Sequence, residues 1–116
     1  MSIVIYHNPR CSKSRKTLEL LEQHQQQPQV IEYLKTPPDA QTLKQLLQKL
    51  GISARDLLRT KEDEYALAGL DNPGLSDDEI IAAMVRFPKL IERPIVVSGN
   101  VAILGRPPEK VLELIG

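Results

Sequence analysis

Three short patterns of hydrophobic and polar positions follow one another at the start of the chain. Residues 2–6 form a β-branched apolar run that an Asn-Pro pair soon ends, which predicts a buried strand. Residues 12–22 carry leucines at helical spacing with polar residues opposite, so a helix is expected to begin near Cys11. Residues 30–34 form a second apolar run. Strand, helix and strand within ~35 residues predict a right-handed βαβ unit with parallel strands.

The middle of the chain is predicted to be helical by the same criterion. A helix is expected over 36–50 with Thr36 as its cap, and shorter helical turns over 53–58 and 61–68. Ser76 and the glutamate three residues later match a capping box, which predicts a further helix with isoleucine and methionine on its buried side.

The end of the chain returns to the strand pattern. Two apolar runs, 95–97 and 101–104, lie on either side of a turn that contains Gly-Asn, which predicts an antiparallel hairpin. A proline pair at 107–108 then begins a last helix. The order β-α-β, helical stretch, β-β-α predicts an α/β protein with one mixed four-stranded sheet.

The whole chain is expected to form one domain, because its 116 residues lie within the usual domain size. Residues 1–35 and 89–116 would make the core of this single domain, and residues 36–88 would be a helical insertion between its two halves. With 41% hydrophobic and 26% charged residues, the composition is that of a globular protein.

Composition and charge exclude several classes of function. Fifteen cations balance fifteen anions and aromatic residues are only 3%, which argues against a nucleic-acid binder. One cysteine excludes an internal disulfide and a cysteine-clustered metal site, so no metal is expected. No apolar run is long enough for a membrane span, and the start lacks the pattern of a signal peptide. A cytoplasmic monomer is the resulting expectation.

Charge is unevenly distributed along the chain. Residues 1–20 hold four cations and one anion, whereas residues 61–80 hold one cation and seven anions. A solvated helical face explains the acidic segment, and a docking face for a partner is the alternative.

Cys11 lies between the first predicted strand and the first predicted helix. Backbone N–H groups at a helix N-terminus favour the thiolate and lower the pKa of a cysteine placed there. Its neighbours are polar or basic, in contrast to those of a cysteine that serves as a small buried apolar residue. Since the thiolate is the nucleophilic form, Cys11 is predicted to be a reactive nucleophile.

The same helix start is a candidate oxyanion site. Residues 11–15 offer backbone amides, hydroxyls and two cations, so an oxyanion could present its central atom to the sulfur. Further arginines would be needed to hold its oxygens in a fork geometry, and the candidates are Arg59, Arg93 and Arg106.

Four segments of the chain carry a further set of motifs. They are residues 5–18 (IYHNPRCSKSRKTL), 92–97 (ERPIVV), 105–109 (GRPPE) and, more weakly, 58–61 (LRTK). In order and spacing the chain resembles, from end to end, the glutaredoxin-coupled arsenate reductase family, and in particular a short branch of it.

The resemblance implies a thioredoxin-like fold with a helical insertion and makes Cys11 the catalytic nucleophile. Pro94 matches the thioredoxin-fold proline whose preceding peptide bond is cis. The oxyanion-binding residues that it implies are Arg59, Arg93 and Arg106. The residues that would support the thiolate are His7, Ser14 and Arg15.

The resemblance also implies the reaction, which is reduction of arsenate or a similar oxyanion. Position 14 is a serine, so no second cysteine three residues on can resolve an adduct on Cys11. External thiols would do so, with glutathione as co-substrate and glutaredoxin as protein partner. No bound cofactor or metal is required.

Two other functions remain open from the residues. A lone cysteine of the Cys-x-x-Ser type also suits a glutathione-dependent thiol/disulfide reductase, a deglutathionylase, although such a reaction does not need three arginines. A non-enzymatic, polymerase-binding relative is the other reading, and the missing second cysteine argues against it.

Overall fold

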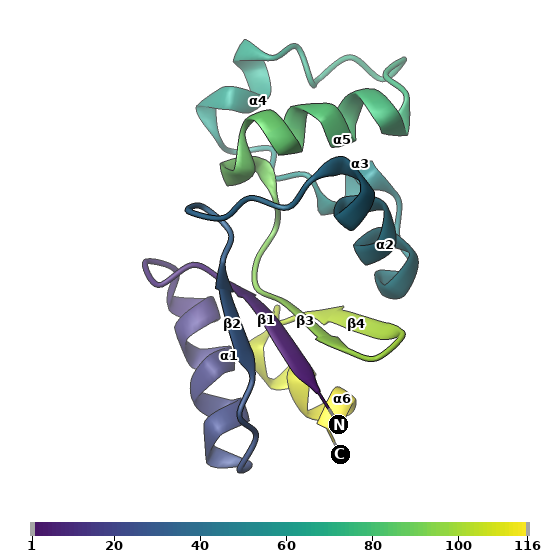
Figure 1. Ribbon diagram of the computed structural model, residues 1–116. Coiled ribbons are helices and arrows are strands. Elements are labelled where there is room, and N and C mark those ends of the chain that lie inside the picture. Colours follow the sequence, from purple (N-terminus) through teal and green to yellow (C-terminus); the bar gives the residue numbers. More distant parts are fainter. Residues whose placement is uncertain (1, 116) are drawn as a thin grey trace. The chain divides into compact units, whose positions relative to one another are not determined.

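The computed structural model describes residues 2–115. The chain divides into two compact units (Figure 1). The first unit contains the residues up to Thr36 and those from Arg93 onward, and the second contains Pro37–Glu92. The sequence placed the limits of the helical insertion at 36 and 88, and the second unit spans residues 37–92. No helix within residues 2–115 is long and apolar enough to cross a membrane.

The first unit is built on one four-stranded sheet. Its strands are β1 (Ile3–His7), β2 (Gln29–Glu32), β3 (Ile95–Ser98) and β4 (Val101–Leu104), in the order β2-β1-β3-β4. β1 pairs with β2 in parallel, and β3 is antiparallel to both β1 and β4. The predicted βαβ unit, hairpin and mixed sheet are confirmed.

Helices cover the sheet of the first unit (Figure 1). α1 (Ser12–Gln23) packs against η2 (Pro108–Val111), a 3-10 turn that continues into α6 (Leu112–Ile115). The core between sheet and helices consists of Ile3, Ile5, Leu21, Val96 and Val111, all at most 4% exposed. Alternation along β1 turns Ile3, Ile5 and His7 toward this core.

The second unit is entirely helical apart from a single β-bridge between Leu58 and Ile91. Its helices are α2 (Ala40–Leu50), α3 (Ala54–Leu57), α4 (Asp63–Leu67), α5 (Asp77–Arg86) and the 3-10 turn η1 (Pro88–Leu90). α5 packs against α2, α3 and η1, and its buried face is Ile80, Ile81 and Met84.

The cap of α2 was predicted wrongly. Asp39, not Thr36, is the N-cap, and its carboxylate accepts the backbone N–H of Thr42 at 2.8 Å. Hydrogen bonds from Thr42 hold the pKa of Asp39 below its ordinary value. Asp39 can act as the cap because its carboxylate reaches the N–H of the third helical residue. Since the helix begins after Asp39, the two prolines before it precede the helix and are not part of its first turn.

The acidic segment is explained largely by helix starts. Asp77, Asp78 and Glu79 form the first turn of α5, and Asp63 and Glu64 the first turn of α4. Anions at these positions complement the helix dipole. Ser76 and Glu79 make the predicted capping box, with bonds of 3.0 and 3.2 Å.

β2 is shorter than predicted and is an edge strand. It ends at Glu32, whose carbonyl accepts the backbone N–H groups of both Lys35 and Thr36 at 2.9 Å. The chain therefore turns at Tyr33 instead of extending to Leu34. Val30 is 44% exposed, as its place on an edge strand allows.

Candidate active site

Cys11 is the N-cap residue of α1, as the sequence predicted for the start of that helix. It is a free, half-buried thiol. Its backbone is extended, with φ −93° and ψ 122°, and its carbonyl accepts the N–H of Arg15 at 3.0 Å. The sulfur is thus placed beside the unpaired N–H groups of the first helical turn.

The loop that carries Cys11 is fixed by hydrogen bonds at both ends. The Cys11 N–H donates to the carbonyl of Asn8, and the Asn8 side-chain oxygen accepts the N–H of Arg10, both at 3.0 Å. Asn8 is only 6% exposed. The Arg15 guanidinium donates to the carbonyl of Pro9 at 2.8 Å. Arg15 was predicted to support the thiolate. In the structure it contacts the cysteine loop through the Pro9 carbonyl.

Ser14 connects the end of β1 to the first turn of α1. Its hydroxyl is fully buried, lies 2.6 Å from His7 Nδ1 and accepts the backbone N–H of Asn8 at 3.0 Å. Burial lowers the pKa of His7, Glu32 opposes this shift and Arg15 adds to it. His7 is therefore neutral at pH 7, and it adjoins Ser14, whose backbone N–H helps to lower the pKa of Cys11.

The pKa of the Cys11 thiol is held below its ordinary value. Burial opposes ionisation, but hydrogen bonds to the sulfur from the Ser14 backbone, the Arg93 side chain and the Lys13 backbone outweigh it. The positive charge of Arg93 adds to the effect. Two independent sources, a helix N-terminus and a guanidinium, thus favour the thiolate.

Arg93 and Arg106 lie close together in the first unit. The Arg106 guanidinium donates to the backbone carbonyl of Arg93 at 3.1 Å. Both arginines are half-buried, and each precedes a cis peptide bond, to Pro94 and to Pro107. The resemblance implied the cis bond before Pro94. The cis bond before Pro107 was not predicted.

Arg59 belongs to the second unit and is paired there with two carboxylates. Its guanidinium contacts Glu92 at 2.7 Å and Glu62 at 3.4 Å, and its side chain is 20% exposed. Its backbone N–H donates to the carbonyl of Leu90 at 2.7 Å. The structure therefore brings Cys11, Arg93 and Arg106 together in one unit, and it holds Arg59 in an ion-pair network in the other.

Sequence reasoning missed two residues of the site. Asn8 was taken only as the end of a strand, yet its buried side chain shapes the cysteine loop. Tyr33 was taken as part of a strand, yet it is 1% exposed and interacts with Arg93. An Asn-Pro pair two residues before a cysteine was the available signal for Asn8. The burial of Tyr33 depends on how β2 pairs with β1, and the sequence alone does not show this pairing.

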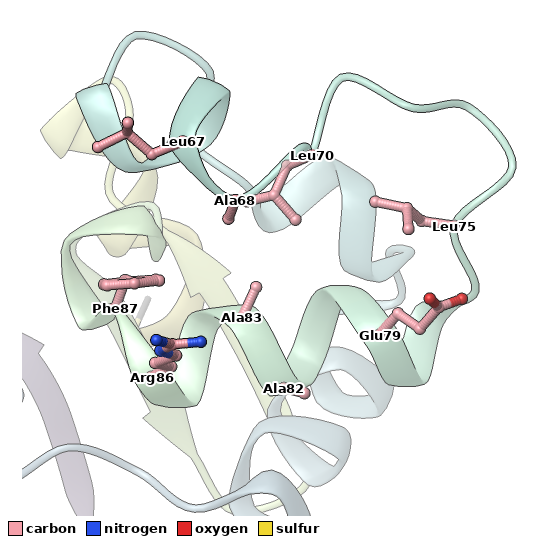
Figure 2. Close-up of a pocket in the computed structure, with 9 residues that line it drawn as sticks. All are labelled: Leu67, Ala68, Leu70, Leu75, Glu79, Ala82, Ala83, Arg86 and Phe87. Carbon is pink, nitrogen blue, oxygen red and sulfur yellow. The ribbon is translucent and has the colours of Figure 1, made fainter.

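A cavity of about 360 Å³ lies within the second unit between the end of α4 and α5 (Figure 2). Leucine and alanine side chains line it, with Glu79 and Arg86 at opposite ends of the α5 face. Arg86 stacks over the ring of Phe87 at 5.2 Å. None of the predicted site residues lines it. Within residues 2–115 no cluster of histidine, cysteine and acidic side chains could hold a metal ion.

A mixed four-stranded sheet with a cis-proline before β3 and an activated cysteine at the start of α1 is a thioredoxin-like arrangement. The protein therefore belongs to the thioredoxin-like class, with a free cysteine at the start of its first helix.

The family follows from comparison with known proteins. The model of the ArsC family matches residues 6–114, so the chain belongs to the ArsC family. It is 56% identical over 98% of its length to the uncharacterized protein YfgD of Escherichia coli, of which the match covers 97%. It is 49% identical to an arsenate reductase of Neisseria meningitidis, with 94% of each chain covered. The solved structure of an arsenate reductase from Vibrio cholerae superposes with a TM-score of 0.95 at 56% identity, covering 97% of each chain.

Proposed function

We propose that this protein reduces arsenate to arsenite, with Cys11 as the nucleophile and glutathione and glutaredoxin as electron donors. The observation that carries the proposal is the place of Cys11 at the N-terminus of α1, where the backbone N–H groups of Ser14 and Lys13 and the Arg93 side chain lower the pKa of its thiol. Those donors stabilise a thiolate, and the same cationic surroundings attract an anion. Arsenate reductases among the similar proteins support arsenate as that anion.

The first step joins sulfur and arsenic. The Cys11 thiolate supplies the electron pair of a new S–As bond, one As–O bond breaks, and the oxygen leaves as water after taking up protons. Arsenic stays in the +5 state. Arg93 and Arg106 are proposed to spread the negative charge of the remaining oxygens, because guanidinium forks match oxyanion geometry. Arg59 is proposed as the third arginine of this set.

Reduction then needs two electrons from external thiols. Glutathione displaces a second oxygen of the Cys11 adduct as water. A glutaredoxin thiolate attacks the glutathione sulfur, an S–S bond forms, and the As–S bond breaks with its electron pair left on arsenic. Water finally displaces Cys11 from arsenic in the +3 state and releases arsenite. Arsenate and two thiols thus give arsenite, one disulfide and water.

The supporting residues act without a bound cofactor in this scheme. Ser14 and Lys13 present backbone N–H groups to the thiolate. His7 is proposed to support the thiolate through the Ser14 hydroxyl, since neutral His7 lies 2.6 Å from it. Arg15 is proposed to support it by fixing the Pro9 carbonyl and with it the loop.

The test couples arsenate reduction to NADPH consumption through glutathione, glutaredoxin and glutathione reductase. We expect turnover with the complete system and none when glutathione or glutaredoxin is omitted. A glutathionylated peptide is offered in place of arsenate in a parallel reaction without glutaredoxin, because glutaredoxin itself reduces such a mixed disulfide. Turnover of the peptide with no turnover of arsenate would overturn the proposal in favour of a deglutathionylase.

A further inference from the structure

Tyr33 lies at the same edge of the sheet as the reactive cysteine. It is the first residue after β2, and the parallel register pairs Glu32 with His7. Tyr33 follows the last pair of this ladder on one strand and Asn8 follows it on the other, so Tyr33 lies at the end of the sheet where the cysteine loop leaves β1. The side chain is 1% exposed, although it follows an edge strand.

Arg93 reaches the same point from the other side of β1. The antiparallel register pairs Ile95 with Tyr6, and Arg93 precedes Ile95 by two residues. Arg93 therefore lies at the same end of β1 as Tyr33. Tyr33 and Arg93 therefore flank the start of the cysteine loop from the two strands that neighbour β1.

The side chain of Arg93 interacts with both Cys11 and Tyr33. Its guanidinium interacts with the Cys11 sulfur and with the Tyr33 hydroxyl, and these interactions raise the pKa of Arg93 against the opposing effect of burial. Its backbone carbonyl is held separately by Arg106 at 3.1 Å. Arg93 is thus fixed at its main chain by one residue and at its guanidinium by another.

We propose that Tyr33 is a positioning residue, whose buried hydroxyl holds the Arg93 guanidinium against the Cys11 sulfur and the reacting oxyanion. An arginine side chain has many rotamers, and a second contact reduces the entropy lost when it binds a ligand. A buried tyrosine hydroxyl in turn favours a nearby polar group such as this guanidinium. The part of the proposal that concerns the oxyanion rests on the proposed function, whereas the part that concerns the thiolate does not.

The test variant is Tyr33→Phe, which removes one oxygen and keeps the ring in its buried place. Two quantities are measured: the pH dependence of Cys11 alkylation, and KM and kcat for arsenate. We expect alkylation at neutral pH to slow by about two- to fivefold, as its midpoint moves to higher pH. KM is expected to rise by a similar factor, about two- to fivefold, with a smaller change in kcat.

Tyr6→Phe is the matched control. Tyr6 lies in β1, one residue before His7, and burial alone accounts for its raised pKa, with no charged partner. Removal of its hydroxyl should leave alkylation of Cys11 unchanged. The other charged or titratable groups at this edge of the first unit are the same in both variants, namely His7, Arg10, Lys13, Arg15, Glu32 and Arg106.

A double-mutant cycle separates positioning from mere packing. If Tyr33 acts through Arg93, Tyr33→Phe should have no further effect on alkylation in an Arg93→Ala background. An equal effect in both backgrounds, or unchanged alkylation in a folded Tyr33→Phe protein, would overturn the proposal. Because alkylation needs no arsenate, this result is independent of whether the protein reduces arsenate.

A second measurement keeps the tyrosine in place, in case Tyr33→Phe does not fold. The NMR signals of the Tyr33 ring should shift on Arg93→Ala, while those of the Tyr6 ring stay where they are. Unshifted Tyr33 signals in the folded Arg93→Ala protein would contradict the proposal.

Discussion

Ser14 Oγ lies 2.6 Å from His7 Nδ1, and the same oxygen accepts the backbone N–H of Asn8 at 3.0 Å. All three residues are at most 7% exposed. One hydroxyl therefore ties the end of β1 to the first turn of α1, between which the loop with Cys11 is held. The position of the nucleophile depends on this buried polar link.

Ser14→Ala removes the link and leaves two buried polar groups without their partner. A buried group that loses its hydrogen bond costs about 1–3 kcal/mol, so we expect the free energy of unfolding in urea to fall by that amount. Ser12→Ala is the matched control, because Ser12 is exposed on the same turn and its loss should cost less than about 0.5 kcal/mol. Equal stabilities of the two variants would contradict the role assigned to Ser14.

The reactivity of Cys11 should depend on pH in a defined direction. Its pKa is lowered despite burial, by the hydrogen bonds that the sulfur accepts from Ser14, Arg93 and Lys13. The thiolate is therefore retained to lower pH, and the alkylation rate should reach half its maximum below the usual cysteine pKa of about 8.5. Arg93→Ala should move this midpoint upward. A midpoint in the folded protein equal to that of the urea-unfolded chain would contradict the assignment.

Gly105 is packed too closely for any side chain. A Cβ atom at this position would lie 2.5 Å from Thr17 Oγ1 and 2.8 Å from Pro94 Cγ, and the Gly105 N–H donates to the Pro94 carbonyl at 3.0 Å. Gly105→Ala is expected to destabilise the protein by about 1–3 kcal/mol, the usual cost of overpacking. Thermal unfolding measures it, with Gly74→Ala as control, since a Cβ there meets only the Asn72 side chain, at 3.3 Å. Two variants with the same melting temperature would show that the contact is relaxed in solution.

Arg106 should contribute to oxyanion affinity. Arg106→Ala removes a guanidinium and also frees the Arg93 carbonyl that it holds. We expect KM for arsenate to rise about tenfold, which corresponds to about 1.4 kcal/mol and is close to the lower limit of what one charge-assisted hydrogen bond contributes. Arg10→Ala is the control, an exposed cation beside Cys11. If both variants raise KM equally, general positive charge, and not a placed guanidinium, attracts the anion.

The strands of the sheet could be predicted from the sequence, because apolar runs mark buried strands and leucines at helical spacing mark the helices between them. The β-branched apolar run over residues 2–6 and the hairpin around Gly99 led to the observed strands. Cys11 could be placed at a helix start for the same reason, since its flanks mark the end of one pattern and the beginning of another.

Contacts between elements could not be predicted in this way. The interaction of Tyr33 with Arg93 depends on the pairing of β1 with two other strands, and the ion pair of Arg59 with Glu92 joins residues that are 33 positions apart. Local competition also misled the prediction at Thr36, where two possible caps stood three residues apart and Asp39 forms the bond to Thr42. Each case depends on tertiary geometry or on a small difference in local free energy.

The most direct test of the central claim is the rate at which the protein forms arsenite from arsenate in the presence of glutathione and glutaredoxin, with product measured directly. Wild type and Cys11→Ser are compared after circular dichroism has shown that both are folded. The account predicts arsenite from the wild type and, from Cys11→Ser, only the rate seen without protein, because a serine hydroxyl is not ionised at neutral pH. A Cys11→Ser rate above about a tenth of the wild-type rate, a loss of barrier stabilisation under about 1.4 kcal/mol, would contradict it.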